Sequence, residues 1–187
     1  MASTETKTAV RPATGTYTID PGHSGVSFTG RHLMISKVRG KFAVDSGTLV
    51  IADDPEQSSV EATVNVGSVE SGDPKRDEHL RSADFFDAEN FPTITFRSTN
   101  VEDHGDGEFT LTGDLTVRGV TKSVSLKGEY LGSSQSPWNT TVVGFSAETV
   151  VNRKDWGLEW NMALEAGGVL VSDKITLTID AEAVLQQ

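Results

Sequence analysis

The stretch VSFTGRHLMISKVRGKFAV, residues 26–44, alternates between two kinds of side chain over its whole length. Its odd positions carry most of the polar and basic side chains, including Arg31, Lys37, Arg39 and Lys41. Its even positions are mainly apolar or small: Val26, Phe28, Gly30, His32, Met34, Ser36, Val38, Gly40, Phe42 and Val44. Because successive strand side chains point to opposite faces, the alternation predicts one apolar face and one basic, solvated face.

The length of this stretch bears on the architecture. It exceeds the usual length of a strand, so it predicts one very long strand, or two strands in register around a kink near Gly30 or Gly40. Long, alternating strands with glycine kinks are typical of a closed antiparallel barrel, whose interior can hold a ligand.

Shorter segments repeat the alternation through the rest of the chain. Turn residues separate them, which predicts antiparallel neighbours joined by short connections. The segments are 17–20, 48–52, 60–66, 93–97, 109–117, 123–130, 143–147 and 175–181. The sequence therefore predicts an all-β protein built as an eight-stranded antiparallel β-barrel.

Two segments depart from the alternation. Residues 73–92 predict a helix, because Asp73 suits an N-cap, Pro74 suits the first helical position and Ser82 can cap a second turn. Its aromatic face would consist of Phe85, Phe86 and Phe91. Residues 152–168 are predicted to be irregular or briefly helical. We expect these segments to supply one or two short helices that cap the barrel.

Several glycines occupy positions that the alternation predicts to face the barrel interior, and they bear on whether the barrel is hollow. They are Gly30, Gly40, Gly113 and Gly128. An inward glycine leaves space for a ligand, which favours a cavity, but a glycine also allows a strand to kink so that the barrel closes. Both interpretations stay open from the sequence.

Composition limits the class of protein. The chain has 187 residues, no cysteine and a net charge of -11, which predicts one domain at residues 15–187 and excludes disulfides and cysteine metal sites. Residues 1–14 are predicted to be a disordered polar tail. The acidic balance argues against nucleic acid and anionic membrane surfaces as main partners. Residues 21–44 nevertheless contain no Asp or Glu, which indicates either a solvated strand face or a local anion site.

Targeting and catalytic motifs are also informative. The N-terminus lacks the apolar segment of a signal peptide, and no apolar run approaches membrane-spanning length, so we expect a cytoplasmic protein without a membrane span. Residues 22–25 are one residue short of a nucleophile elbow, and no phosphate-binding loop occurs. The histidines His23, His32, His79 and His104 lack metal-ligand spacing. We therefore expect no catalytic residue and no metal site.

Four ordered motifs resemble one family. They are YTIDPGHSGVSFTGRHLMISKVRGKF (residues 17–42), RDEHLRSADFFDAENFPTITFRS (76–98), GDLTVRGVTKSVSL (113–126) and NRKDWGLEWNMALEAGGVLVSDKITLTIDAEA (152–183). Together they are similar to the YceI-like polyisoprenoid-binding proteins. The resemblance implies an extended lipocalin-like barrel that binds a long isoprenoid chain in its lumen without enzymatic activity. Ligands within the family range from isoprenoid quinones to polyprenyl phosphates and other amphiphiles, so the resemblance implies an isoprenoid lipid or a similar amphiphile as the partner. Many members carry an export signal, which this N-terminus lacks.

The candidate ligand-binding residues follow from the inward parity and the aromatic segments. The apolar candidates are Phe28, Met34, Val38, Phe42, Val64, Phe85, Phe86, Ile94, Phe96, Leu111, Leu115, Phe145, Trp156 and Trp160. Each of them is also a plausible plain core residue. A lipid head group must lie at a hydrated mouth. The candidates there are Arg31, His32, Arg76, His79 and Arg81, followed by Asn152, Arg153 and Lys154.

The predicted function is non-enzymatic binding, carriage or sequestration of a long-chain isoprenoid lipid, with no cofactor required beyond that bound lipid. One alternative is an enzyme acting on an amphiphile in the barrel, with His32 or His79 as the base beside Asp77. The other is a stress-response adaptor that binds a protein partner. The sequence leaves a homodimer open.

Overall fold

Antiparallel pairing organises the whole chain. The computed structural model describes residues 11–165 and 167–187, and in that part of the chain nine strands form one sheet. The strands are β1 (Gly15–Ile19), β2 (Gly25–His32), β3 (Ser36–Ile51), β4 (Ser59–Asn65), β5 (Thr93–Gly105), β6 (Glu108–Val117), β7 (Val120–Gln135), β8 (Thr141–Asn152) and β9 (Lys174–Leu185).

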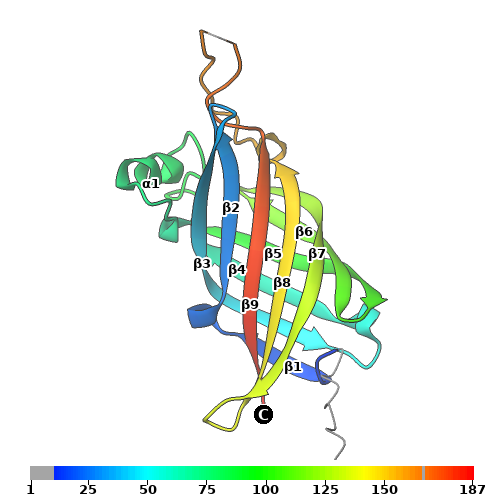
Figure 1. Cartoon of the computed structure of the whole chain (residues 1–187). Coiled ribbons are helices and arrows are strands. Elements are labelled where there is room, and N and C mark those ends of the chain that lie inside the picture. The colour runs from blue at the N-terminus through cyan, green and yellow to red at the C-terminus, as the bar shows by residue number, and fades with distance from the viewer. Residues whose placement is uncertain (1–10, 166) are drawn as a thin grey trace, which may run out of the picture.

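The sheet closes on itself. β3 pairs with β2 on one side and with β4 on the other, so β2 to β9 form a ring that gives the elongated barrel in Figure 1. β1 and β2 both lie between β3 and β9, and a short 3-10 helix, η1 (Pro21–His23), separates them. They share one strand position, so the predicted eight-stranded antiparallel barrel is confirmed.

Residues 26–44, the long alternating stretch of the sequence, form a hairpin of β2 and β3. β2 ends at His32 and β3 begins at Ser36, so the prediction of one long strand, or of a kink at Gly30 or Gly40, is wrong. The chain reverses at Leu33, Met34 and Ile35 instead. Because the partners across the hairpin have the same parity, as in the pair Phe28 and Gly40, the alternation runs through the turn without a break.

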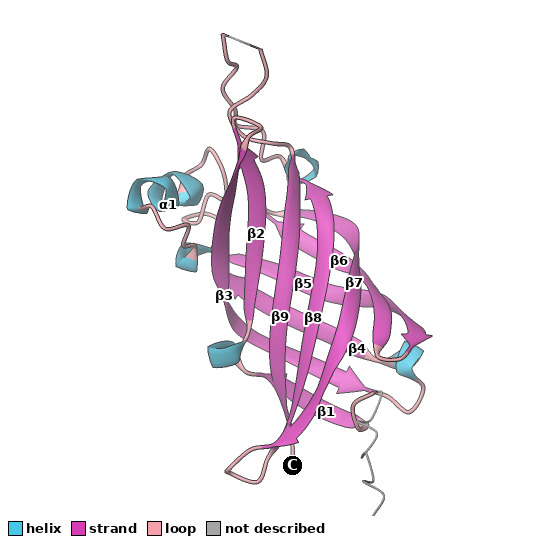
Figure 2. Cartoon of the chain, viewed as in Figure 1, coloured by secondary structure: helices cyan, strands magenta, loops and turns pink. Residues whose placement is uncertain are grey.

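Alternate connections lie at opposite ends of the barrel. We call one end the α1 end; it holds the β2–β3 turn, helix α1 (Pro74–Arg81), the β6–β7 turn and the β8–β9 connection with η4 (Arg153–Trp156) (Figure 2). The opposite end holds the β3–β4 connection with η2 (Pro55–Gln57), the β5–β6 turn and the β7–β8 connection. A further 3-10 helix, η3 (Val66–Ser68), follows β4.

The helical segment is shorter than its sequence predicts. Asp73 caps α1 by accepting hydrogen bonds from the amides of Lys75 and Arg76, as expected. The helix ends at Arg81, whereas the sequence predicts helix as far as residue 92. Ser82 ends it, because its hydroxyl donates to the His79 carbonyl and its own carbonyl accepts from the Phe85 amide in an irregular turn. The brief helical turn predicted after residue 152 is present as η4.

The inner faces of the strands form the apolar interior. Buried side chains along it include Phe42, Val44, Val64, Ile94 and Leu126.

Of the predicted tail, residues 1–10 lie outside the described residues. Arg11 and Thr14 form hydrogen bonds with Asp53 after β3. Within the described ranges, no helix is both long enough and apolar enough to cross a bilayer.

Candidate ligand-binding cavity

The barrel encloses an apolar cavity that reaches toward both ends. Its volume is about 580 Å³, which lies within the range of about 300–1,000 Å³ typical of small-molecule sites. Its wall includes residues of every strand from β2 to β9 together with residues of α1 and η4. An interior of this size and character suits an elongated apolar ligand.

Most of the predicted site residues lie on the wall of this cavity. They are Phe28, Arg31, His32, Val38, Phe42, Val64, Arg76, His79, Phe85, Phe86, Ile94, Phe96, Leu111, Leu115, Phe145, Trp156 and Trp160. Arg153, a further candidate, also lies on the wall. Four candidates lie elsewhere: Met34 is 53% exposed at the β2–β3 turn, Arg81 ends α1 away from the wall, and Asn152 and Lys154 flank Arg153 without lining the cavity. Met34 falls on the even positions that were predicted to face inward. It lies in the turn between the strands, however, and its side chain is exposed to solvent. A role in ligand binding stays a prediction for the others.

Three of the four inward glycines, Gly40, Gly113 and Gly128, lie beside aromatic rings rather than open space, whereas Gly30 lines the cavity. A Cβ at Gly113 would lie 2.4 Å from Cζ of Phe96, and one at Gly128 would lie 2.2 Å from Cζ of Phe109. The ring of Phe28 fills the corresponding space at Gly40. These glycines therefore make room for aromatic rings against the wall.

Aromatic rings line the cavity at the α1 end. Phe86 meets Phe42 edge-on, with centroids 5.1 Å apart. His79 meets Trp160 and Phe85 edge-on, with centroid distances of 4.6 and 5.0 Å. Such edge-to-face contacts stabilise the structure in addition to the stabilisation that comes from burying each ring. The turn after α1 and the β8–β9 connection thus form an aromatic rim around this mouth.

Polar side chains at the same mouth are held by specific partners. Arg76 donates to the hydroxyl and the carbonyl of Ser71. His79 Nε2 lies 2.8 Å from Asp84 Oδ2. Asp77 instead accepts from the amide and hydroxyl of Ser71. The pairing of His79 with Asp77 in the enzyme alternative is therefore wrong, and Asp84 is the carboxylate that orients His79.

Arg153 is the buried cation of this end. Its side chain is 6% exposed and donates to the carbonyls of Ser172, Leu158 and Trp160. Its remaining amino group lies 3.7 Å from Asp173 Oδ1. Burial lowers the pKa of the guanidinium, and the Asp173 carboxylate opposes that shift. Arg153 ties the β8–β9 connection to the barrel and contributes positive charge to the cavity wall.

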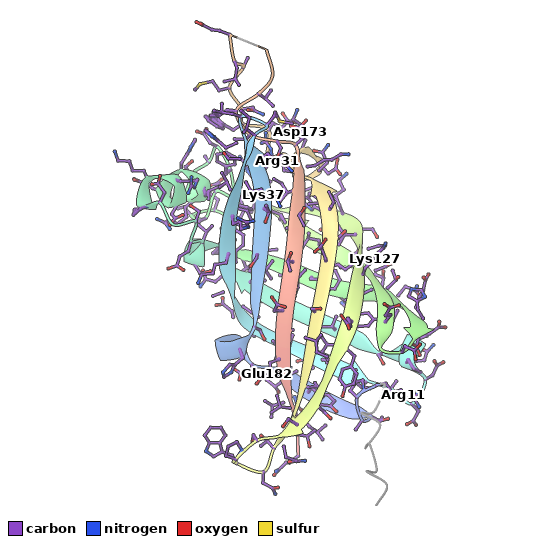
Figure 3. All side chains as sticks on the ribbon, in the orientation of Figure 1. Arg11, Arg31, Lys37, Lys127, Asp173 and Glu182 are labelled. Carbon is purple, nitrogen blue, oxygen red and sulfur yellow. The ribbon has the colours of Figure 1, made fainter. Side chains whose placement is uncertain are left out.

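The two ends of the cavity differ in charge. The α1 end carries Arg31, His32, Arg76, His79 and Arg153 on its wall, whereas the opposite end carries Arg11, Asp103, Glu108 and Tyr130. Figure 3 shows Arg31 and Asp173 at one end of the barrel, and Arg11 and Glu182 at the other. The α1 end is thus the mouth with more cationic side chains.

A cluster outside the cavity escaped the sequence analysis. His23 Nδ1 lies 2.8 Å from Asp20 Oδ2 and 3.9 Å from Glu182 Oε1, and these three side chains are close enough to share a metal ion. Asp20 Oδ1 also accepts from the Gly22 amide, so its carboxylate caps η1. The hydrogen bond to Asp20 and the charge of Glu182 raise the pKa of His23, and the same hydrogen bond lowers the pKa of Asp20.

Comparison with known proteins identifies the family. The family model for the YceI-like domain matches residues 17–183 of this chain. The chain belongs to the YceI-like family. It is 36% identical over 166 residues to the protein YceI of Escherichia coli O157:H7, a match that covers 88% of this chain and 83% of that protein.

Solved structures of similar proteins share the barrel. A Campylobacter jejuni YCEI protein superimposes with a TM-score of 0.68 at 30% identity, covering 84% of this chain and 90% of that chain. A domain from Saccharophagus degradans, described as a polyisoprenoid binding domain, has a TM-score of 0.67 at 13% identity over 91% of this chain and 98% of that one. At that identity the second likeness shows the fold alone. The same barrel fold thus occurs in a chain that shares only 13% of its residues with this one.

Proposed function

We propose that this protein binds one long-chain isoprenoid lipid, such as an isoprenoid quinone or a polyprenyl phosphate, and carries or sequesters it without chemical change. The observation that carries the proposal is the elongated apolar cavity of about 580 Å³ inside the barrel. The Saccharophagus degradans domain of the same fold is described as polyisoprenoid binding, which supports the same class of ligand here.

The charge of the two mouths supports an orientation for the ligand. A charged or polar head group needs hydration or hydrogen bonds, and Arg31, Arg76 and His79 line the wall at the α1 end. We infer that the head group lies there and that the chain extends toward Phe109 and Tyr130 at the opposite end.

A binding role fits the polar side chains better than catalysis does. His79 has an orienting carboxylate in Asp84, but their side chains are 37% and 51% exposed, and a general base works best in a site that excludes water. Among the described residues, no serine or threonine hydroxyl on the cavity wall is paired with a histidine. Binding of a protein partner by an adaptor would not account for the apolar cavity inside the barrel.

Chain length provides the quantitative test. Burying a five-carbon isoprene unit contributes roughly 3–4 kcal/mol before ordering costs, and association costs remove much of that gain. Affinity for prenyl alcohols should therefore rise with the number of isoprene units and level off when the cavity is full. Equal affinity for all lengths, or no binding to any of them, would contradict the proposal.

The purified protein offers a direct identification. Native mass spectrometry and solvent extraction should recover about one equivalent of unchanged lipid. Recovery of a converted product with turnover would support the enzyme instead, and an empty protein that retains a specific protein partner would support the adaptor. The expected cytoplasmic location stays a prediction, which cell fractionation checks.

The mouth can be tested with a matched pair of arginines. Arg76 lines the cavity and Arg81, five positions along the same segment, does not. Arg76→Glu should weaken a prenyl phosphate far more than the corresponding prenyl alcohol, because only the phosphate interacts with the charge. Arg81→Glu should change both little. Equal losses for alcohol and phosphate in Arg76→Glu would mean that Arg76 is structural.

A further inference from the structure

The β2–β3 turn projects an apolar tip from the α1 end of the barrel. Ile35 is 79% exposed, Met34 53% and Leu33 39%. Beside the tip, Met162 is 55% exposed on the β8–β9 connection, where the Leu170 carbonyl accepts a hydrogen bond of 2.9 Å from the Leu33 amide. Two neighbouring connections therefore present large apolar side chains to solvent at one place.

The backbone of the tip makes these side chains unexpected. Leu33 and Met34 have φ angles of 54° and 60°, in the left-handed region that glycine, asparagine and aspartate occupy at lower cost. A turn that only reverses the chain ordinarily uses those residues. Because both side chains are exposed, packing within the chain does not account for them. An external apolar contact would account for them.

Positive charge flanks the tip, although the whole chain has a net charge of -11. Arg31 and Lys37 are exposed and face one another across the hairpin, and Figure 3 shows both near the α1 end of the barrel. The surrounding residues 21–44 contain no Asp or Glu. The neighbouring β8–β9 connection contributes opposing charges at the exposed Asp155, Glu159 and Glu165. Its fourth carboxylate, Asp173, lies against Arg153 and Lys154.

We propose that this tip docks on an anionic lipid bilayer. Leu33, Met34 and Ile35 enter the boundary between head groups and acyl chains, while Arg31 and Lys37 lie against lipid phosphates. Exposed apolar residues with flanking cations are the combination that interfacial membrane binding uses. A second copy of the chain fits this feature less well, because a stable interface buries about 800 Å² and roughly 20–30 residues on each partner.

Docking at the tip brings the mouth of the cavity to the bilayer surface. Arg31, His32, Leu170 and Val171 adjoin the tip and line the cavity. A lipid could then pass between cavity and bilayer over a short path. The docking proposal rests on the exposed tip and its charge, and it requires no ligand, so its failure leaves the proposed function untouched.

Cosedimentation with vesicles tests the apolar contact. The variant Leu33→Asn/Met34→Asn/Ile35→Gln should keep the turn, because asparagine tolerates the left-handed region. Its partition onto vesicles of three parts phosphatidylcholine to one part phosphatidylglycerol should fall at least roughly tenfold. The matched control is Trp138→Gln, which removes a side chain that is 82% exposed on the β7–β8 connection at the opposite end. This control should bind like the wild type.

Charge variants test the electrostatic contribution on the same vesicles. Lys37→Gln should weaken binding by roughly fivefold, and Glu165→Gln should strengthen it. Both effects should vanish on pure phosphatidylcholine and shrink at high salt. Lys127→Gln is the matched control, because Lys127 is also exposed on a strand but lies away from the α1 end (Figure 3).

A fluorescent probe reports where the contact forms. The chain has no cysteine, so Met34→Cys carries one environment-sensitive dye, which should shift to the blue with vesicles while a dye on Trp138→Cys does not. The proposal is overturned if the wild type does not bind these vesicles, or if Trp138→Gln loses as much binding as the tip variant. It is also overturned if light scattering shows a dimer that the tip variant dissociates while vesicle binding is unchanged.

Discussion

The ring of Phe28 occupies the space that a side chain on Gly40, its cross-strand partner, would fill. A Cβ at position 40 would lie 2.2 Å from Cζ and 2.6 Å from Cε1 of Phe28. Phe28 also packs against Phe42 and Phe86, with centroid distances of 5.4 and 6.4 Å. These rings limit the directions in which Phe28 can move. Gly40 therefore sets the position of an aromatic ring on the cavity wall.

Replacing Gly40 tests this relationship. Gly40→Ala should lower the free energy of unfolding by about 1–3 kcal/mol, because the added methyl group displaces a packed ring. Urea denaturation measures the change. Gly144→Ala is the control, since a Cβ there would first meet Leu131 Cβ at an ordinary 3.7 Å. Adding Phe28→Leu to Gly40→Ala should recover part of the loss, and a fully stable Gly40→Ala protein would contradict the account.

The sequence predicted which residues face inward better than it predicted what they do there. Strand side chains repeat every two residues, so parity alone assigned Phe28, Phe42 and Leu115 to the cavity wall. Parity does not show how a neighbouring strand fills the space beside a glycine. That is why Gly40 was interpreted as open space or as a kink when it accommodates a ring.

The turn at residues 33–35 was missed for a related reason. Its odd length preserves the parity of the two strands, and Leu33 and Met34 are not the residues that usually mark a hairpin. Contacts that depend on the folded path of the chain were equally invisible. Neither the approach of Glu182 to His23 nor the choice of Asp84 over Asp77 as partner of His79 follows from local spacing.

Arg153 should be a major source of stability at the α1 end. Arg153→Met removes hydrogen bonds to the carbonyls of Leu158, Trp160 and Ser172 and leaves Asp173 without its buried partner. Each buried carbonyl that loses its donor costs about 1–3 kcal/mol, whereas Asp173 is 41% exposed and keeps Lys154 as a partner. Thermal and urea unfolding should both show the loss.

Lys154 provides the comparison for that variant. Its Nζ lies 3.3 Å from Asp173 Oδ2, but its side chain is 46% exposed. Lys154→Met should cost less than about 1 kcal/mol, because solvent screens an exposed ion pair. Similar losses for Lys154→Met and Arg153→Met would show that burial does not distinguish the two cations.

A bulky side chain inside the barrel should shorten the longest ligand that fits. Ala147 lies on the cavity wall in β8, between Gly128 and Ile179 of the neighbouring strands. In Ala147→Phe, affinity for prenyl alcohols should level off about one isoprene unit earlier, because the ring takes up space that the chain would use. Ala43→Phe places the same ring on an exposed position of β3 and should leave the length dependence unchanged. An unaltered plateau in Ala147→Phe would argue against a ligand in the lumen.

The contact between His23 and Asp20 should make a pH-dependent contribution to stability. The pKa of His23 is raised above 6.5, so its contribution is fully present below pH 6.5 and is lost as pH rises through the raised value. The pKa of Asp20 is lowered below 3.8, so its contribution is present above pH 3.8 and is lost as pH falls through the lowered value. The contact therefore stabilises the fold most between these limits.

Stability and titration measurements on variants of this contact check the sign. His23→Gln should destabilise the protein more at about pH 5.5 than at about pH 8.5, because only the protonated imidazole gains from both carboxylates. In an NMR titration, Asp20→Asn should lower the pKa of His23 more than Glu182→Gln does, since the hydrogen bond to Asp20 is the larger cause of the shift. Asparagine can still accept from the Gly22 amide, so the cap of η1 is retained. A His23 that titrates at 6.5 in the wild type, or that ignores Asp20→Asn, would show that the pair does not form in solution.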